Sequence, residues 1–308
     1  MPGRRLHAAP KKQLFEPGRC RGTGASRYNP SQMSNTHLAI LGGGNMGRAL
    51  IGGLLRRGTR PEQISVGESF PAARESLASE LGIEATADNL AAVANATLVV
   101  VAVKPQDAGS VLSALRSVLN KNCPTVLSVA AGIRVSALEA WCGPGVPVVR
   151  AMPNRPALVG AGATGLYAPA HVNAAHRAAA QHVMEAAGEV VWVPSEEALD
   201  IVTALSGSGP AYFFLLAELM ASAAVDLGLE PQAARRLAVA TLYGSGLLAH
   251  ADDADLARLR EQVTSKGGTT EAALRSLTNA DLRGIVARAL ESATVRSREL
   301  ASQFGTLR

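Results

Sequence analysis

The sequence predicts an α/β protein in which a mostly parallel β-sheet is followed by a domain of helices alone. Three observations support this fold class. From His37 to Pro194, short apolar runs alternate with amphipathic stretches, which is the pattern of β-α-β units. A glycine-rich turn at residues 42–47 joins the first such run to the first helix. After Pro194 helical patterns follow one another, and no strand pattern recurs as far as Arg308.

The expected strands are short and rich in Val, Ile and Leu. The run TLVVVAV at residues 97–103 predicts the strongest strand, because it is β-branched, uncharged and bounded by polar residues. We therefore expect it near the centre of the sheet, buried on both faces. The expected strands are residues 38–41, 64–67, 97–103, 125–129, 146–150, 161–167 and 190–193. The helices expected between them are residues 45–57, 71–81, 107–119, 135–141 and 172–187.

The change of pattern near residue 194 predicts a domain boundary. We divide the chain into a tail (residues 1–32), a dinucleotide-binding domain (33–194) and a helical domain (195–308). Small faces on two helices allow close approach, as in an intertwined dimer, and ordinary packing within a monomer is the alternative. These faces consist of Ala221, Ala223, Ala224, Ala234, Ala238 and Ala240. The helices expected in this domain are residues 197–205, 211–227, 231–248, 255–262, 270–277 and 281–304.

The formal net charge of +5 on the 308-residue chain comes from its tail. Residues 1–32 hold seven of the 30 Lys and Arg and one of the 25 acids, so residues 33–308 carry 23 basic and 24 acidic groups. A body that binds nucleic acid would need a surplus of cations, so we expect no nucleic-acid partner. The tail has neither the apolar segment of a secretory signal nor a periodic apolar face. We expect it to be disordered, with Met33 as the functional start.

The sequence favours a soluble cytoplasmic protein without a membrane span or a metal. The apolar stretch at residues 211–229 is interrupted by Glu218 and Asp226 and is expected to be too broken to cross a bilayer. The three cysteines (Cys20, Cys123 and Cys142) show no C-x-x-C spacing, and the histidines show no H-x-x-x-H spacing. Neither a disulfide framework nor a metal site is therefore expected.

The turn GGGNMG follows the first expected strand and begins the first helix. Its G-x-G-x-x-G pattern allows a tight turn and a close approach of the backbone to a pyrophosphate, while the helix N-terminus offers free N–H groups. Glu68 lies 21 residues past Gly47, where an acid can bind a ribose 2′-hydroxyl and favour NAD; a solvated loop acid is the alternative. Arg74 is near enough to accommodate a 2′-phosphate. We expect a Rossmann-like domain that binds a dinucleotide through Gly42, Gly43, Gly44, Asn45, Met46 and Gly47.

Two further strand ends carry candidate cofactor contacts, because ligands of open α/β sheets bind beyond the carboxyl ends of the strands. In VAVKP, Lys104 places a cation beside the crevice and Pro105 stiffens the exit from the strand. After the next strand, AAG at residues 130–132 is small enough for a nicotinamide to lie against the backbone. A surface lysine and an ordinary packing turn are the respective alternatives.

A second glycine-rich loop, SKGGTT at residues 265–270, leads into a helix of the C-terminal domain. Its exposed N–H groups and hydroxyls suit an anion; a helix–loop–helix turn with a Thr N-cap is the alternative. The turn SGSGPAY at residues 206–212 begins the longest apolar helix, and its glycines favour close packing between domains. Neither a nucleophile–base pair nor a carboxylate cluster stands out. The chemistry therefore needs little acid–base help, as hydride transfer to an activated acceptor does.

At GGGNMG, VAVKP, SGSGPAY and VTSKGGTTEAAL, the chain resembles the pyrroline-5-carboxylate reductases. The likeness extends from about Met33 to Phe304, with the motifs in the same order. It implies a Rossmann domain and a helical dimerisation domain, with a homodimer that can assemble further and an active site that can combine two subunits. It implies the final step of proline biosynthesis, in which NAD(P)H reduces 1-pyrroline-5-carboxylate to L-proline by hydride transfer to the cyclic imine carbon.

The resemblance also implies roles for particular residues. The first glycine turn would hold the pyrophosphate, with Glu68, Ser69 and Asn89 at the adenosine. Thr270 would place its hydroxyl near the ring nitrogen, and with Lys104 it is a catalytic candidate. The acid that the family has before SGSGPAY would be Glu196 or Glu197, of which we prefer Glu197. The nicotinamide side would consist of Ala102, Val103, Lys104, Pro105, Ala130, Ala131 and Gly132. The substrate carboxylate would meet Ser265, Gly267, Gly268 and Thr269.

Two positions depart from the family pattern, and two other functions compete. Glu68 and Ser69 occupy a place where small, neutral or basic residues are common, which leaves the choice between NADP and NAD open. Lys266 occupies the place of a common proline. A β-hydroxyacid dehydrogenase would need a lysine on the helix after the glycine-rich segment, and residues 207–220 contain none. A non-catalytic NAD(P) sensor would need the first glycine turn but not SKGGTT.

Overall fold

A computed structural model describes residues 36–251 and 255–305 of the chain. The tail predicted at residues 1–32 lies outside the described residues. The described residues form one compact unit, so the division at residue 194 stays a prediction about domains within that unit. The described elements include the predicted α/β part and a C-terminal part with helices and no strands among its described residues.

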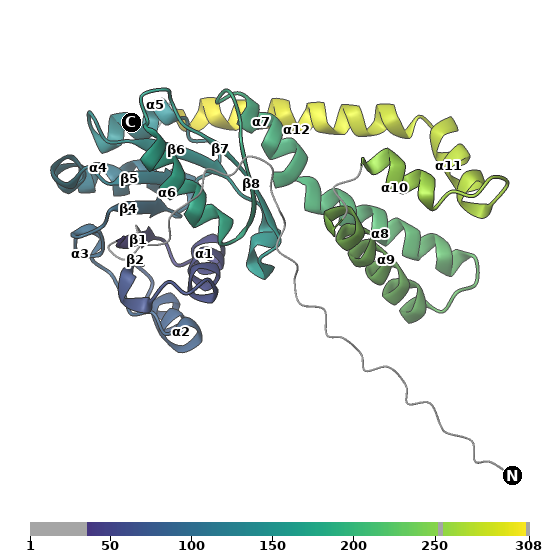
Figure 1. Cartoon of the computed structure of the whole chain (residues 1–308), viewed down its shortest axis with the longest axis horizontal. Coiled ribbons are helices and arrows are strands. Elements are labelled where there is room, and N and C mark those ends of the chain that lie inside the picture. Colours follow the sequence, from purple (N-terminus) through teal and green to yellow (C-terminus); the bar gives the residue numbers. More distant parts are fainter. Residues whose placement is uncertain (1–35, 252–254, 306–308) are drawn as a thin grey trace, which may run out of the picture. The chain divides into compact units, whose positions relative to one another are not determined.

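The described strands form one sheet in the order β3-β2-β1-β4-β5-β6-β7-β8 (Figure 1). The pairs from β3 to β6 are parallel, β7 is antiparallel to β6, and β8 is parallel to β7. The order of the first six strands is that of the Rossmann fold. The strands are β1 (Leu38–Leu41), β2 (Ile64–Gly67), β3 (Ala85–Thr86), β4 (Leu98–Val101), β5 (Thr125–Ser128), β6 (Val148–Met152), β7 (Gly162–Tyr167) and β8 (Gly188–Trp192).

Both faces of the sheet are covered by helices, because successive strand residues point to opposite sides. On one face, Ile40 and Val100 belong to a core that includes side chains of α1, α2 and α6. On the other face, Leu41 and Val101 belong to a core that includes side chains of α3, α4 and α5. All four residues of β4 are buried, which confirms the predicted buried strand. These helices are α1 (Asn45–Arg56), α2 (Pro71–Leu81), α3 (Asn89–Val93), α4 (Pro105–Asn122), α5 (Val135–Cys142) and α6 (Ala174–Glu185).

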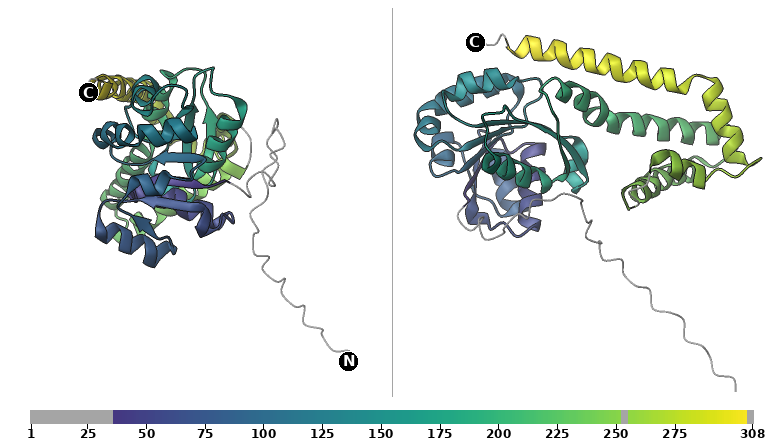
Figure 2. Two further views of the ribbon diagram at one scale, coloured as in Figure 1. Left: turned by 90° about the vertical axis from the view of Figure 1, so that its left-hand side faces the viewer. Right: turned by 45° about the horizontal axis from the view of Figure 1, so that its top comes forward.

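The C-terminal helices pack on one another while leaving much apolar surface uncovered. Helix α8 lies against α9, and α12 lies along α7 and the π-helical turn Thr203–Gly207 (Figure 2). Large side chains of α8 such as Phe213, Phe214 and Leu219 are more than half exposed. Another surface must cover them, because contiguous apolar patches of this kind mark interfaces. The helices are α7 (Ala198–Val202), α8 (Gly209–Asp226), α9 (Pro231–Ala251), α10 (Leu256–Gln262), α11 (Thr269–Asn279) and α12 (Leu282–Gly305).

The sequence missed the shortest elements and misplaced some ends. Strand β3 has two residues and α3 has five, which is too short for either period to show. The strand expected at residues 146–150 is β6, Val148–Met152. Helix α4 begins at Pro105, two residues earlier than expected, because proline suits the first helical position.

The apolar helical segment that ends at Asp226 is longer than the sequence predicted. The run Ala198–Asp226 is long and apolar enough to cross a bilayer by length and composition alone. The sequence argument missed it because the π-helical turn joins α7 to α8 without a break. Only 6% of the apolar stretch within this run is buried in the chain, so the same exposed surface also suits a protein interface.

Candidate functional site

The ends of several parallel strands meet at one edge of the sheet, where Rossmann folds bind their ligands. The amide of Gly42 donates to Gly67 O at 2.8 Å, which joins the end of β1 to the end of β2. The amide of Ala102 donates to Leu41 O at 2.8 Å, which joins the exit of β4 to β1. The residues predicted at the cofactor therefore come from neighbouring strand exits.

The glycine turn 42–47 requires glycine at two positions for geometric reasons. Gly42 has a φ of +104°, and a Cβ there would lie 2.7 Å from Ala102 O. A Cβ on Gly47 would collide with Gly42 O, which is backbone and cannot move aside cheaply. Gly44, in contrast, faces open space and is the N-cap of α1, with no side-chain hydrogen bond to the first turn. The amides that follow it lack intrahelical acceptors, so this surface is equipped for an anion.

Glu68 lies at the predicted place, but its carboxylate already has two backbone partners. Its Oε2 accepts from the amide of Gly43 at 2.7 Å, and its Oε1 accepts from the amide of Phe70 at 2.8 Å. The residue is 8% exposed. Arg74 Nη1 donates to the carbonyl oxygens of Glu68 and Ser69, at 2.9 Å each. The acid therefore fastens the glycine turn to the turn after β2, and any ribose contact uses its remaining lone pairs.

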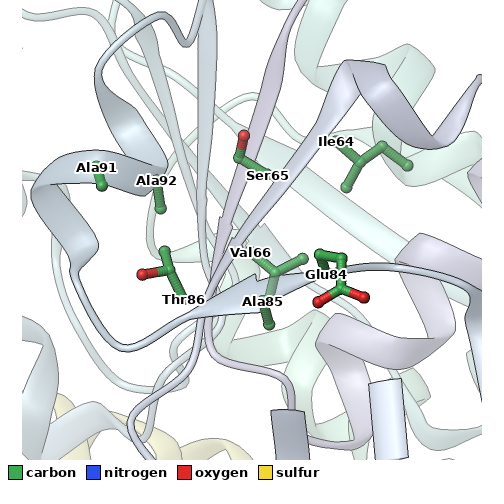
Figure 3. Close-up of a pocket in the computed structure, with 8 residues that line it drawn as sticks. All are labelled: Ile64, Ser65, Val66, Glu84, Ala85, Thr86, Ala91 and Ala92. Carbon is green, nitrogen blue, oxygen red and sulfur yellow. The ribbon is translucent and has the colours of Figure 1, made fainter. Parts of the chain in front are cut away.

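Asn89, which the resemblance places at the adenosine, lies beside the end of β2. A Cβ on Gly67 would collide with Asn89 Oδ1, so the amide side chain lies directly over that glycine. Asn89 also lines a pocket of about 340 Å³ between α3 and α4. A second pocket, of about 220 Å³, lies along β2 and β3 and is lined by Glu84, Thr86, Ala91 and other residues (Figure 3). Its lining contains no residue of either glycine-rich loop.

Two further strand exits present the residues predicted on the nicotinamide side. Lys104 is the N-cap of α4, with an exposed side chain, and Pro105 takes the first helical position. After β5, Ala130 is 3% exposed and Gly132 has a φ of +76°. After β5, the small Ala130 and Ala131 and the left-handed Gly132 add little side-chain bulk to the backbone, as the predicted nicotinamide contact needs.

The second glycine-rich loop differs from the predicted arrangement in the use of its amides. Gly267 donates its N–H to Glu271 Oε2 at 2.7 Å, and Gly268 donates to Ser265 O at 3.0 Å. The resemblance assigned both amides to a substrate carboxylate, and here one has a partner in the loop and the other in the first turn of α11. The amides without intrahelical acceptors begin at Thr269, because α11 starts there and Gly268 is its N-cap without a side-chain bond. Thr270 belongs to this first turn.

The two candidate acids before SGSGPAY behave differently. Glu196 Oε1 accepts from Arg150 Nη1 and from the amide of Val135, at 2.8 Å each. Glu197 is exposed, and hydrogen bonds from its own amide and from Ser195 hold its pKa below the ordinary value. Glu196 therefore faces the sheet. The preferred Glu197 remains a prediction for substrate contact.

Asn154 is a well-placed polar residue that the sequence argument missed. It follows β6 and is 9% exposed. Its Nδ2 donates to Ser206 O at 3.0 Å, and its Oδ1 accepts from the amide of Ala163 at 2.8 Å. The side chain thus fixes the π-helical turn to the end of the sheet. An asparagine in MPN directly after an apolar strand was the available signal.

The two glycine-rich loops are not brought together by substantial contacts between their elements within one chain. Among the described elements, α11 packs mainly on α12, and neither α10 nor α11 contacts the sheet to a comparable extent. The described residues include no group of three or more His, Cys, Asp or Glu that could hold a metal ion.

These features define a Rossmann-type NAD(P)-dependent oxidoreductase with an appended helical domain. Residues 37–132 match a family described as NADP oxidoreductase, coenzyme F420-dependent. Residues 196–300 match the pyrroline-5-carboxylate reductase dimerisation family. The chain belongs to the pyrroline-5-carboxylate reductase family, and its dimerisation domain indicates a homo-oligomer.

The similarity to known proteins extends over nearly the whole length of those proteins. The pyrroline-5-carboxylate reductase of Pseudomonas aeruginosa is 44% identical, over 89% of this chain and 100% of that protein. The Mycobacterium leprae enzyme of the same name is 42% identical, over 87% and 97%. A solved pyrroline-5-carboxylate reductase from Coxiella burnetii has a TM-score of 0.84 at 38% identity, covering 87% and 99%. A Plasmodium falciparum pyrroline carboxylate reductase with NADP bound has a TM-score of 0.74 at 28% identity, covering 87% and 99%.

Proposed function

We propose that this protein reduces 1-pyrroline-5-carboxylate to L-proline with NADPH or NADH, the final step of proline biosynthesis. One observation carries the proposal: a glycine turn at the β1–α1 junction of a Rossmann sheet occurs in one chain with a matched dimerisation domain that contains the SKGGTT loop. The bound cofactor supplies a hydride to the imine carbon. Hydride addition to the protonated imine moves the C=N electron pair onto the nitrogen, which keeps its proton and becomes the ring amine.

The cofactor would lie along the carboxyl edge of the sheet. The first-turn amides of α1 bind the pyrophosphate, with Glu68, Ser69 and Asn89 at the adenosine. Small residues support the nicotinamide end: Ala102, Val103, Pro105, Ala130, Ala131 and Gly132. Lys104 holds a positive charge beside this crevice. A lysine there attracts the substrate carboxylate and the cofactor phosphates.

The substrate would bind at the first turn of α11. The amides of Thr269 and Thr270 face the carboxylate of the imino acid, with Ser265 and the two loop glycines beside it. The Thr270 hydroxyl accepts from or donates to the ring nitrogen and holds its orientation. A protonated imine already carries the positive charge that activates its carbon, so positioning contributes more than a strong general acid.

A second subunit would complete this site. The exposed apolar side chains of α8 and α9 require a partner surface, and the α11 turn does not pack on its own sheet. A homodimer that exchanges these helices satisfies both requirements, and such dimers can associate further. The enzyme would act in the cytoplasm, where reduced nicotinamide cofactors are available.

An absorbance assay tests the function directly. Wild-type protein is mixed with 1-pyrroline-5-carboxylate and either NADPH or NADH, and the loss of reduced-cofactor absorbance is followed. Turnover supports the reductase; binding of cofactor without turnover with either one supports an NAD(P) sensor instead. Thr270→Ala should lower kcat by about 10- to 100-fold with an unchanged cofactor Kd, and Thr270→Ser should restore most of it. Unchanged turnover in Thr270→Ala would remove this hydroxyl from the site.

A further inference from the structure

Asp200 is fully buried, and it holds together two elements that lie far apart in the sequence. Its Oδ2 accepts from Arg134 Nη2 at 2.8 Å, and its Oδ1 accepts from Ser297 Oγ at 2.7 Å. Arg134 is the N-cap residue of α5, in the Rossmann domain. Ser297 is 6% exposed and belongs to α12, at the other end of the chain. The chemistry described above uses none of these three side chains.

A second ion pair lies beside the first, at the start of α5. Arg150 on β6 is 2% exposed, and its Nη1 donates to Glu196 Oε1 at 2.8 Å. The same oxygen accepts from the amide of Val135, the residue after Arg134. Burial lowers the pKa of Arg150, and the hydrogen bond and charge of Glu196 oppose that decrease. Both residues at the start of α5 are therefore fixed by acids from the segment around α7.

The segment held in this way is the one that leads from β5 to α5. It begins with Ala130 and Gly132, which we place against the nicotinamide, and it ends at Arg134. Ile133, between Gly132 and Arg134, is fully buried, so the packing that holds it also links the turn to Arg134. Buried ion pairs seldom add more stability than apolar residues of similar size, but they fix geometry wherever both partners are directional.

We propose that Asp200 is a positioning residue for hydride transfer. Through its ion pair with Arg134, Asp200 fixes the position of the turn at residues 130–132 relative to the nicotinamide ring. Because Asp200 also bonds Ser297, the position of the turn depends on how α7 and α12 are placed. Both helices belong to the matched dimerisation region. This inference rests on the proposed function, because it needs the nicotinamide at the turn.

Three substitutions test it, with a control on the same helix. Asp200→Asn, Arg134→Lys and Ser297→Ala each weaken one contact of the network. The control is Glu299→Gln, two residues after Ser297 on α12. It removes only the exposed ion pair of Glu299 with Arg296, so this variant should behave as wild type. For Asp200→Asn and Arg134→Lys we expect kcat to fall about 10- to 100-fold while the KM for the imino acid changes less than about threefold. Ser297→Ala should show a smaller decrease in kcat.

Two readouts separate positioning from general loss of structure. With deuterium at the transferred position of the reduced cofactor, the primary isotope effect on kcat should stay at or above the wild-type value, because hydride transfer becomes the slow step. Amide hydrogen exchange should increase at residues 130–135 and remain unchanged in β1.

The proposal is wrong if the variants lose thermal stability while kcat stays within about twofold of wild type, or if kcat falls with a smaller isotope effect. Should Asp200→Asn fail to fold, Arg134→Lys and Ser297→Ala decide the question by the same criteria. Inactive wild-type protein would contradict the proposed function instead, and the hydrogen-exchange comparison would then decide whether the network holds the turn.

Discussion

The backbone amide of Gly43 donates a 2.7 Å hydrogen bond to the carboxylate of Glu68, 25 residues further along the chain. The other oxygen of that carboxylate accepts from the amide of Phe70. One buried acid thus fastens the first glycine turn to the turn after β2. We expect this carboxylate to lie where the 2′-phosphate of NADP would bind, so that one residue would affect both the strength and the selectivity of cofactor binding.

We predict that Glu68→Gln weakens the binding of both NADH and NADPH but shifts the preference toward NADPH. Glutamine keeps the size but has only one acceptor oxygen, so either Gly43 or Phe70 loses its partner. Loss of a charge-assisted hydrogen bond costs about 1.5–3 kcal/mol, or about a 10- to 150-fold increase in the Kd of NADH. NADPH should lose less, because the repulsion of its phosphate also disappears. Titration of both cofactors measures this, with Glu75→Gln on the exposed side of α2 as the control. Equal losses for the two cofactors would contradict the assignment.

We predict that alanine at Gly42 destabilises the fold, while alanine at Gly44 does not. An alanine Cβ at Gly42 would meet Ala102 O at 2.7 Å with φ at +104°, whereas Gly44 has an extended backbone and open space. Backbone strain of this kind costs about 1–3 kcal/mol, so the Tm of Gly42→Ala should fall by several degrees. Thermal unfolding without cofactor makes the comparison. Equal Tm values for the two variants would show that the turn tolerates a side chain at either place.

We predict that Phe214→Glu dissociates the oligomer. Phe214 is 61% exposed on α8 within one chain, and a carboxylate buried at a subunit interface without a partner is strongly unfavourable. Light scattering coupled to size exclusion should show monomers, with activity lost in parallel, because we propose that a second subunit completes the site. Val191→Glu on the edge strand β8 is the control, since Val191 is 58% exposed outside the helical domain. Wild-type mass for Phe214→Glu would move the interface elsewhere.

We predict that Cys142 resists alkylation at pH 8 while Cys123 reacts. Burial, reinforced by the nearby charge of Glu139, raises the pKa of Cys142 to about 12. At pH 8 only about one thiol in ten thousand is then a thiolate, and the side chain is inaccessible as well. Cys123 is exposed. Peptide mapping by mass spectrometry after iodoacetamide treatment should find Cys123 modified in the native protein and Cys142 modified only after unfolding. Fast native modification of Cys142 would contradict its burial.

Much of the fold followed from local patterns in the sequence. The strand at residues 38–41 and the helix at residues 71–81 occur with the predicted bounds, because apolar periodicity and an N-terminal proline are local signals. The two-residue strand β3 gave no such signal. Its place at the sheet edge depends on pairing with Val66 and Gly67 in β2.

The candidate site divides in the same way. The positions of Gly42, Glu68 and Ala102 at adjoining strand ends could be predicted, because parallel strands bring their carboxyl ends to one edge. The partners of the Glu68 carboxylate could not be predicted, since both are backbone amides that any sequence would offer. Nor could the different partners of Glu196 and Glu197 be predicted, since only the packing of distant elements brings Glu196 to the buried Arg150.

The sequence by itself determined the Rossmann sheet, the glycine turn and the family, because spacing and residue type encode them directly. Tertiary structure alone decided which amides of residues 267–270 stay available, since Glu271 and Ser265 take two of them. It also decided that Asp200 joins Arg134 to Ser297. Contacts between residues this far apart depend on how the elements pack in three dimensions, and no local pattern along the chain records that packing.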